Sequence, residues 1–329
     1  MEFNIEHFLE KHYNENEKII LACSTWPDSM FLLYKILESK YKKNLVVCYF
    51  NHKLRKEADD EEKWIEELWK KEWFTVEIAD CEVEKIRDQF YPSKWLEEVA
   101  REKRYAFLNA ILNIYNADKI ITGHHLDDKI ETFFFNLVRW TKLTWLINMK
   151  EKSGPILRPL LNIEKKDILK YLDENNLKYN TDNTNFDTKL SRNNLRHNII
   201  PLFENINSNY KNNINNLSNY LEEVKDFIDT EVKNFLYEQW IKIFNSCKYK
   251  INTLSINWYF YIKDFNKLSK LLQKEIIRHI FYISNWKSTI WLTESNINEV
   301  IKFINWKNNK TVKEIKEMKL KKDNEIIIF

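Results

Sequence analysis

The sequence contains very little glycine. Only 2 of its 329 residues are Gly, whereas average usage of about 7% would place roughly 23 in a chain of this length. A fold with many turns needs residues that tolerate positive φ, and glycine does so without steric cost. The chain has instead an excess of tryptophan, with 12 residues. The shortage of one residue and the surplus of the other call for a joint explanation.

The sequence also lacks the segments that mark secreted and membrane proteins. Its first 18 residues are charged throughout and contain no apolar core of a signal peptide. No run of about 18 apolar residues occurs, so no membrane span is expected. The four cysteines are scattered without a C-x-x-C pair, which favours reduced thiols over a disulfide framework or a zinc site. We therefore expect a cytoplasmic protein.

Size and charge set only broad limits. A chain of 329 residues suits two domains better than one, and a hydrophobic fraction of 44% supplies a sizeable core. Charged residues make up 31% of the chain, but the net charge is only +3. A small net charge neither indicates nor excludes a nucleic-acid partner, because local patches matter more than totals.

Short apolar runs alternate with amphipathic helical patterns in the first half of the chain. This alternation predicts an α/β fold with a parallel, doubly wound sheet. In such a sheet ligands bind at the carboxyl ends of the strands. Strands are expected at 18–23, 45–50, 74–79 and 119–122, and helices at 29–40, 58–72, 97–115 and 127–139.

Beyond this region the pattern becomes mainly helical. Helices are expected at 163–175 and 194–203, although Pro201 leaves the second boundary open. The Asn- and Ser-rich stretch 205–216 predicts a linker. A lysine-rich helical segment follows, and short alternating strands are expected at the end of the chain. The predicted domains are 1–207 and a smaller, mainly helical domain 208–329.

The first motif, LACSTWPDSMFLL, reads as a strand, a tight polar turn and a helix. Free N–H groups and partial positive charge at a helix N-terminus hold phosphates. Hydroxyl groups of Ser24, Thr25 and Ser29 are candidate donors to a pyrophosphate, and Asp28 is a candidate ligand of a divalent ion. An ordinary capped helix is the alternative, because Asp and Ser are good N-caps and a short motif is weak alone.

Two further motifs flank the predicted sheet. FNHKLR places Asn51, His52 and Arg55 at the carboxyl end of the second strand, where a polar loop with a capping Asn is the alternative. WLEEVAREKRYAFL places Arg101 and Arg104 on one helix face. An arginine there is suited to binding triphosphate in a bidentate manner. The alternative is a solvated face of weak salt bridges.

The motif TGHHLDDKIETFFFNLVRW begins where the fourth strand ends. Asp128 and Glu131 lie one turn apart on the next helix, so both can face the strand ends. Two carboxylates there fit Mg²⁺, which takes few protein oxygens together with nucleotide phosphates. His124 is a candidate for nucleotide contact or proton transfer. The spacing does not match the H-E-x-x-H pattern of a zinc site.

The last motif, TDNTNFDTKLSRNNLRHNIIPLF, contains two arginines four residues apart, Arg192 and Arg196. Neighbours at this spacing share a helix face and are suited to gripping a phosphate of a nucleotide or of an RNA backbone.

Together the motifs resemble the PP-loop ATPases and, among them, the tRNA(Ile)-lysidine synthetases, from about residue 18 to 205. The first motif is similar to the S-G-G-x-D-S loop, with Ser24, Asp28 and Ser29 matching, and Thr25 and Trp26 standing at the two glycine positions. The other patterns are N-H-x-L-R, E-x-x-A-R-x-x-R-Y, G-H-x-x-D-D-x-x-E-T and D-x-[ST]-N-x-D followed by R-N-x-x-R and a proline. They are matched by Asn51, His52, Arg55, Glu97, Ala100, Arg101, Arg104, Tyr105, Gly123, His124, Asp127, Asp128, Glu131, Thr132, Asp182, Thr184, Asn185, Asp187, Arg192, Asn193, Arg196 and Pro201.

The resemblance implies an adenine-nucleotide alpha-hydrolase-like fold and a ligase that uses ATP and Mg²⁺. Its substrates would be L-lysine and tRNA(Ile) with the anticodon CAU. The C2 oxygen of the wobble cytidine is adenylated with release of pyrophosphate, and the ε-amine of lysine then displaces AMP. The basic C-terminal domain would hold the tRNA by phosphate contacts, and a homodimer is compatible with the family.

The resemblance also implies the roles of site residues. The loop would bind pyrophosphate, Asp128 and Glu131 would bind Mg²⁺ or lysine, and Arg104 and Arg196 would bind ATP. The predicted catalytic residues are Asp28, Arg104, His124, Asp128, Glu131 and Arg196. The predicted nucleotide-binding residues are Ser24, Thr25, Trp26, Pro27, Asp28, Ser29 and His52.

Several of the tryptophans stand where such a protein needs glycine. Trp26 lies in the loop, Trp73 ends a helix where Gly is usual at C′, and Trp140 and Trp145 replace family glycines. Trp286 and Trp306 each follow Asn, where Asn-Gly turns are expected.

Two explanations of the tryptophans compete. We favour a gene that uses UGA for glycine and was translated as though UGA meant tryptophan. The alternative is a diverged protein with a damaged phosphate loop. Two other functions are therefore kept open, namely another PP-loop tRNA-modifying enzyme and, if Trp26 is genuine, a catalytically inactive tRNA-binding homologue.

Overall fold

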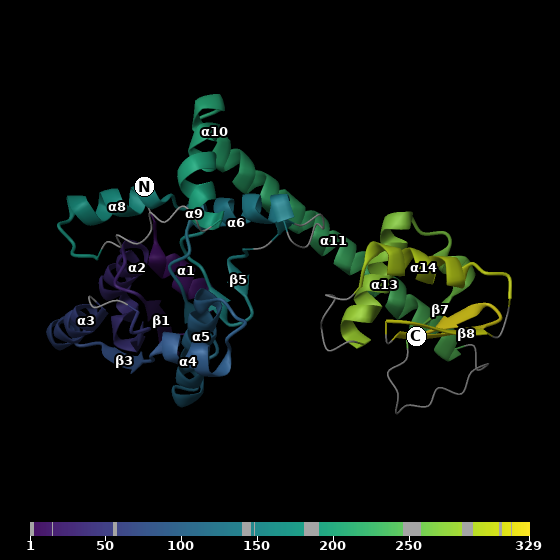
Figure 1. The fold of residues 1–329 in the computed structure, drawn as a ribbon, viewed down its shortest axis with the longest axis horizontal. Coiled ribbons are helices and arrows are strands. Elements are labelled where there is room, and N and C mark those ends of the chain that lie inside the picture. The colour runs from purple at the N-terminus through teal and green to yellow at the C-terminus, as the bar shows by residue number, and fades with distance from the viewer. Residues whose placement is uncertain are drawn as a thin grey trace. The chain divides into compact units, whose positions relative to one another are not determined.

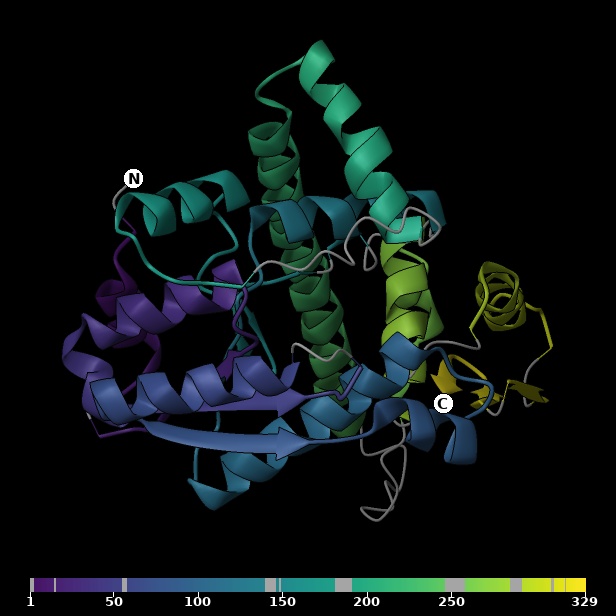
Figure 2. The ribbon, with the colours of Figure 1, turned by 60° about the vertical axis from the view of Figure 1, so that its left-hand side comes forward.

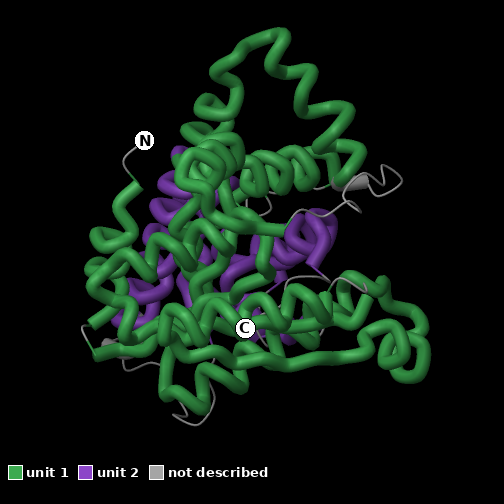
Figure 3. The backbone as a smooth tube through the Cα atoms, turned by 90° about the vertical axis from the view of Figure 1, so that its left-hand side faces the viewer, with its two compact units in different colours: residues 1–219 green, residues 220–329 purple. Residues whose placement is uncertain are grey.

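The chain divides into two compact units, residues 1–219 and 220–329, which Figure 3 shows in different colours. The computed structural model describes residues 3–14, 16–54, 58–139, 146–147, 149–180, 191–245, 258–284, 292–308, 311–316 and 318–329, with backbone alone at 191–192 and 243–245. Several residues named above lie outside the described residues, namely Arg55, Trp140, Trp145, Trp286 and the predicted site residues at 182–187, as does the side chain of Arg192.

The first unit is built on a six-stranded sheet with the order β3-β2-β1-β4-β6-β5. All neighbouring strands are parallel except β5 and β6, which form an antiparallel pair at the edge. Figure 2 shows β2 and β3 as arrows that point the same way. The strands are β1 (Ile19–Cys23), β2 (Leu45–Asn51), β3 (Thr75–Asp80), β4 (Ile120–Ile121), β5 (Lys152–Ser153) and β6 (Ile156–Leu157). The predicted parallel α/β sheet is confirmed.

Helices pack on both faces of this sheet, and the alternation of side chains along β1 shows how. Ile19 and Leu21 belong to one buried cluster with α1, α2 and α8. Ile20 belongs to another with α5. Because successive residues of a strand point to opposite faces, a continuous apolar run serves both layers. The helices are α1 (Ile5–His12), α2 (Pro27–Leu37), η1 (Lys40–Asn44), α3 (Ala58–Glu72), α4 (Val83–Phe90), α5 (Leu96–Ile114), α6 (Leu126–Arg139) and α8 (Lys165–Glu174).

The chain after α8 differs from the sequence expectation at the predicted linker, and β7 (Tyr259–Tyr261) lies in a stretch that was expected to be helical. Residues 205–216 were expected to form a linker, but α11 (Tyr210–Asn245) begins within them and runs for 36 residues. Tyr210 is buried and Ile214 packs against the same cluster as Leu126 and Ile130. Tertiary packing thus overrides the poor helix propensity of Asn. Along the chain, the first compact unit ends at residue 219, inside α11. The domain ranges 1–207 and 208–329 stay a prediction.

Pro201 sits in the first turn of a helix, which resolves the boundary that the sequence left open. The backbone passes from α9 (Ser191–Asn194) through a π-helical turn, η3 (Leu195–Ile199), into α10 (Ile200–Ile206). Proline is tolerated in a first turn, where no N–H bond is lost, and disrupts the helix before it. The widened π turn absorbs this disruption immediately beside Arg196.

The second unit combines the rest of α11 with smaller helices and an antiparallel sheet of order β7-β10-β9-β8 (Figure 1). The sheet confirms the short strands expected at the end of the chain. Asp264 accepts hydrogen bonds from Lys242 (3.0 Å) and Gln239 (3.2 Å) of α11. The elements are β7 (Tyr259–Tyr261), α12 (Ile262–Phe265), α13 (Lys270–Ser284), α14 (Glu294–Ile304), β8 (Thr311–Ile315), β9 (Met318–Asp323) and β10 (Ile326–Ile328).

One lysine in this unit is buried. Lys322 of β9 is only 5% exposed, and its ammonium donates to the carbonyl oxygens of Ile304, at 2.9 Å, and Trp306. It therefore satisfies carbonyl groups at the C-terminal end of α14, where a helix has no partners of its own.

Among the described residues, no helix is long and apolar enough to cross a membrane.

Candidate active site

The loop between β1 and α2 is held closed by its own hydroxyl groups. The Ser29 hydroxyl accepts from the backbone N–H of Ser24 (3.1 Å), lies 3.2 Å from the Ser24 hydroxyl and donates to the Trp26 carbonyl (3.1 Å). Pro27 occupies the first helical turn and Asp28 follows it. The loop thus presents the N-terminus of α2 at the carboxyl end of β1, which is where a phosphate would bind.

Thr25 and Trp26, which stand at the two glycine positions of this loop, have different backbone conformations. Thr25 is fully buried with φ 63°, a left-handed conformation that strains a β-branched residue. Asn180 stabilises it by donating its backbone N–H to the Thr25 carbonyl (3.0 Å). Trp26 has φ −78° and ψ 160°, which any residue adopts. An indole at position 26 therefore adds bulk to the loop without straining its backbone.

Gly123, at the end of β4, lies directly against this loop. A Cβ at Gly123 would come within 3.0 Å of the Ser29 nitrogen and 3.2 Å of the Asp28 Cβ. Only glycine allows β4 to approach the start of α2 this closely. The close packing brings the turn at 123–125 and the first residues of α6 next to the phosphate loop.

Three carboxylates surround His125 at this junction. Its Nε2 lies 3.6 Å from Asp28 Oδ2 and 3.5 Å from Asp128 Oδ2, and its Nδ1 lies 3.6 Å from Asp127 Oδ2. Burial alone would lower the pKa of His125, but these carboxylates raise it above its usual value. The side chain is 97% buried, so the imidazole is enclosed among these acidic groups.

Asp127 and Asp128 have different partners although they are adjacent in sequence. The oxygens of Asp127 accept from the backbone N–H of Lys165 (2.8 Å) and the ammonium of Lys211 (2.6 Å). Burial opposes ionisation of Asp127, but these donors and His125 keep its pKa well below the usual range. Asp127 therefore ties α6 to α8 and α11, whereas Asp128 faces Asp28 across His125.

Glu131 and Arg196 form a bidentate ion pair in the site. Arg196 donates Nε to one oxygen of Glu131 (2.5 Å) and Nη2 to the other (2.8 Å). The same Nη2 lies 3.6 Å from Asp128 Oδ1. Burial raises the pKa of Glu131 despite this arginine. A bidentate pair fixes both partners in direction as well as distance, so the π turn after α9 delivers Arg196 to the acidic end of α6.

The other side of the 123–125 turn is positively charged. Burial lowers the pKa of His124 to about 4, and Arg158, Arg101 and Arg104 reinforce the shift. His124 is therefore neutral near pH 7, with Nδ1 2.8 Å from the Thr122 hydroxyl. His124 and His125 are adjacent in sequence, but His124 lies near arginines and His125 lies among carboxylates.

The donor set fits Mg²⁺ when nucleotide phosphates complete it. The buried Oδ1 of Asp28 has no hydrogen-bond partner among the described residues, and Asp128 faces it across His125. No group of three or more metal-ligating side chains occurs in the described parts of the chain. Mg²⁺ needs only one or two carboxylates beside phosphates and water. Because Arg196 occupies both oxygens of Glu131, the pair Asp28 and Asp128 fits the ion better than the predicted pair Asp128 and Glu131.

Most predicted site residues that the structure describes meet at this edge of the sheet. Asp128, Glu131 and Arg196 lie beside the loop, next to His125 and Asp28, and Arg104 acts on the pKa of His124 at the neighbouring turn. His52 lies at the end of the neighbouring strand β2, with its ring 4.8 Å from that of Phe50, and its contact with nucleotide stays a prediction. The sequence analysis missed four residues: His125, Arg158, Lys165 and Lys211. His125 could have been found from its place next to His124, and Arg158 from its place directly after a strand. Lys211 lies in the Asn-rich stretch that was read as a linker, so it had no such signal.

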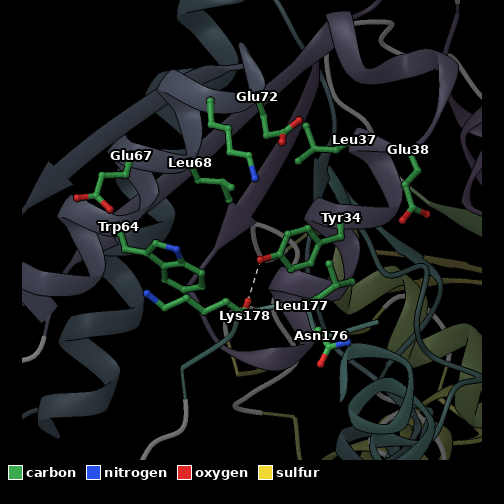
Figure 4. A pocket seen from close by; sticks show the side chains of 11 residues that line it. Tyr34, Leu37, Glu38, Trp64, Glu67, Leu68, Glu72, Asn176, Leu177 and Lys178 are labelled. Carbon is green, nitrogen blue, oxygen red and sulfur yellow. Dashed lines mark hydrogen bonds between the residues drawn. The ribbon is translucent and has the colours of Figure 1, made fainter. Parts of the chain in front are cut away.

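A separate groove lies beside the later turns of α2 (Figure 4). It has a cavity volume of about 510 Å³ and lies between the later turns of α2 and α3 and residues 176–178. Tyr34 donates to the Lys178 carbonyl across it (2.8 Å), and Lys178 Nζ lies 4.7 Å from the Trp64 ring centre. Tyr34 is six residues beyond Asp28, or roughly 9 Å along the helix. The groove contains none of the predicted catalytic residues.

Comparison with known proteins gives a consistent result. Residues 1–203 match the family model described as a PP-loop domain. The chain is 34% identical over 246 residues to the tRNA(Ile)-lysidine synthase of Thermosipho africanus, covering 71% of this chain and 56% of that protein. It is 30% identical over 301 residues to the tRNA(Ile)-lysidine synthase of Mycoplasma mycoides subsp. mycoides SC, covering 89% and 73%.

The chain spans about half the length of several curated relatives that it matches. Among solved structures, the U34-tRNA thiolase NcsA from Methanococcus maripaludis aligns with a TM-score of 0.53 and 19% identity, over 64% of this chain and 73% of that one. This likeness shows the fold alone.

Proposed function

This chain belongs to the tRNA(Ile)-lysidine synthase family of PP-loop proteins, and on that premise we propose that it joins L-lysine to C2 of the wobble cytidine of tRNA(Ile) with anticodon CAU. ATP is consumed, and AMP and pyrophosphate are released. One observation supports the proposal most strongly. The phosphate loop and the acidic start of α6 meet around His125, with Asp28 and Asp128 each within 3.6 Å of its Nε2.

The first step is adenylation of the tRNA. The C2 oxygen of cytidine attacks the α-phosphorus of ATP, and the bond from that phosphorus to the pyrophosphate oxygen breaks. The N-terminus of α2 and the hydroxyl groups of Ser24 and Ser29 hold the leaving pyrophosphate. Asp28 and Asp128 would hold Mg²⁺, which supplies charge neutralisation for the phosphates. The chain's own contribution is positioning and electrostatic stabilisation.

The second step transfers lysine. The neutral ε-amine attacks C2, the C2–O bond breaks, and AMP leaves with that oxygen while the amine proton passes to solvent. The acidic end of α6 attracts the cationic amino acid, and Arg196 fixes the direction of Glu131. Arg104 and Arg196 lie on either side of the turn and bind ATP in this account.

Two other functions were kept open by the sequence. Another PP-loop tRNA-modifying enzyme is not favoured, because the relatives named above are tRNA(Ile)-lysidine synthases. An inactive tRNA-binding homologue is favoured by one observation, namely the bulk of Trp26 inside the loop. A cytoplasmic location and a homodimer are part of the proposal.

The test is incorporation of radiolabelled lysine into a tRNA(Ile) transcript, with ATP and Mg²⁺ and nucleoside analysis by mass spectrometry. The chain as printed and its Trp26→Gly variant are compared, with Glu131→Gln in the second background as control. We expect lysidine with the Trp26→Gly protein, none with Glu131→Gln, and none when the wobble cytidine is replaced by uridine. Salt-sensitive tRNA binding without lysine incorporation in either background would leave the inactive homologue.

A further inference from the structure

Three polar side chains on the first turns of α11 contact the start of α6. Lys211, Asn215 and Asn219 follow one another at intervals of four residues, so they lie along one face of the helix. Lys211 donates its ammonium to Asp127 Oδ1 (2.6 Å). Asn215 and Asn219 each accept from the ammonium of Lys129, at 2.8 Å. This face of α11 therefore holds α6 at two points in its first turns.

The same face of α11 also binds the segment that leads into α8. Lys211 donates to Glu164 Oε2 (2.9 Å), and Asn215 donates Nδ2 to Asn162 Oδ1 (3.1 Å). Glu164 is the residue that precedes the first residue of α8. Because Lys211 bonds both Asp127 and Glu164, a single lysine joins α6 and the start of α8 to α11.

These contacts are largely shielded from water. Lys129 is 5% exposed, and the side chains of Lys211 and Asp127 are 22% and 25% exposed. Charged groups in such surroundings are screened less than pairs on the surface, and removal of one partner leaves the other poorly compensated. Loss of the Lys211 ammonium would therefore change the position of Asp127 rather than only remove a surface charge.

Asp127 belongs to the junction at the phosphate loop. Its Oδ2 lies 3.6 Å from His125 Nδ1, and His125 Nε2 lies 3.5 Å from Asp128 Oδ2. The backbone N–H of His125 donates to the same oxygen of Asp128 (3.1 Å). A shift of Asp127 would therefore be passed to His125 and Asp128, the two residues that face the phosphate loop.

We propose that the first turns of α11 position the acidic start of α6 for catalysis, with Lys211 as the main positioning residue. Lys211 acts through Asp127 rather than by contact with a substrate. The match to the PP-loop family model ends at residue 203, so the inference assigns a role in the site to a helix beyond that domain. It deepens the proposed function and rests on it only for the reaction whose rate is measured.

The experiment compares three variants in the Trp26→Gly background. Lys211→Met removes the ammonium but keeps an unbranched side chain, and Lys211→Arg keeps the charge. Lys225→Met is the matched control, because Lys225 lies on the same helix and pairs with Asp229 of α11 itself. The side chain of Lys225 is 18% exposed, close to the 22% of Lys211.

Two measurements are made on each variant, and urea unfolding establishes that each variant is folded. The first is hydrogen exchange at the amides of His125 and Lys165, which donate to Asp128 (3.1 Å) and Asp127 (2.8 Å). The second is the steady-state rate of lysine incorporation into the tRNA(Ile) transcript, with kcat separated from the KM for tRNA.

We expect both amides of Lys211→Met to exchange roughly tenfold faster and kcat to fall roughly tenfold, as for loss of hydrogen bonds from a charged donor. The KM for tRNA should stay unchanged, because Lys211 does not act by contact with the tRNA. Lys211→Arg should restore most of both losses, and Lys225→Met should leave exchange and kcat as they are in the parent.

Folded Lys211→Met protein with the exchange rates and kcat of Lys225→Met would overturn the inference. Losses in Lys211→Met that Lys211→Arg does not restore would also overturn it, because the charge would then not be the cause. Failure of the proposed function is distinguishable. If the parent makes no lysidine, that function fails, and hydrogen exchange still decides whether Lys211 positions α6.

Discussion

Replacing Trp73 by glycine should stabilise this protein, although the substitution removes a large aromatic side chain. Trp73 follows the last residue of α3 with φ 59°, its N–H bonds the Trp69 carbonyl (2.9 Å), and its side chain is 87% exposed. This is the C′ position at which helices favour glycine. Because the exposed indole buries little apolar surface, the effect of the substitution is determined mainly by the backbone conformation at residue 73.

The size of the effect follows from two opposing terms. A non-glycine residue in the left-handed region costs about 1–2 kcal/mol. Glycine loses more chain entropy on folding, by about 0.4–1 kcal/mol. The net gain for Trp73→Gly is therefore about 0.5–1 kcal/mol, which corresponds to a rise in melting temperature of roughly 1–4 °C for a unit of this size.

The assay is urea unfolding of the full chain, monitored by circular dichroism, with Trp69→Gly as matched control. Trp69 lies inside the same helix and is 40% exposed, so glycine there should destabilise by about 1 kcal/mol or more. If glycine destabilises the protein at position 69 and stabilises it at position 73, the result supports the assignment of position 73 as a glycine site. Destabilisation of similar size at both positions would refute the reasoning, and with it the structural support for UGA decoding as glycine.

Three further predictions concern other parts of the chain. Gly123→Ala should lower ATP affinity at least tenfold and destabilise the protein by about 1–3 kcal/mol, because the new Cβ would displace the start of α2. Calorimetry measures the affinity and urea unfolding measures the stability. An unchanged ATP affinity would contradict the packing described. Burial opposes ionisation of Asp264, but Lys242 and its other donors lower its pKa to about 2, below the unfolded value of about 3.9. The contribution of Asp264 to the free energy of unfolding is therefore present above pH 4 and lost as the pH falls towards 2. Asp264→Asn should destabilise the protein by up to about 1 kcal/mol at pH 7 and by almost nothing at pH 2. Equal destabilisation at both pH values would contradict this prediction. Lys322→Met should destabilise by about 1–3 kcal/mol, because the carbonyl groups at the end of α14 lose their donor; an unchanged unfolding midpoint would show that water replaces the ammonium.

Much of the first unit could be predicted from apolar periodicity. The central strands β1 and β4 are short, mostly aliphatic runs, and burial on both faces requires such a run. The glycine requirement at Trp73 could also be inferred, since a charged helix ended immediately before a strand. The start of α11 could not, because Asn disfavours helices locally and only the packing of Tyr210 and Ile214 compensates.

The site was predictable where residues are neighbours in sequence and less so where the fold brings them together. Asp128 and Glu131 share a helix face, which their spacing shows. The pairing of Arg196 with Glu131 depends on a π turn before Pro201, and the pairing of Lys211 with Asp127 depends on the long helix. Neither pairing leaves a local signal, because each joins segments more than 60 residues apart.

The most direct test of the central claim uses ATP labelled at the α-phosphate, the tRNA(Ile) transcript and the Trp26→Gly protein. Without lysine, the account predicts transfer of the label to the tRNA with release of pyrophosphate, and addition of lysine should then release the label as AMP. Absence of label transfer and of pyrophosphate release, with tRNA bound and the protein folded, would contradict the account.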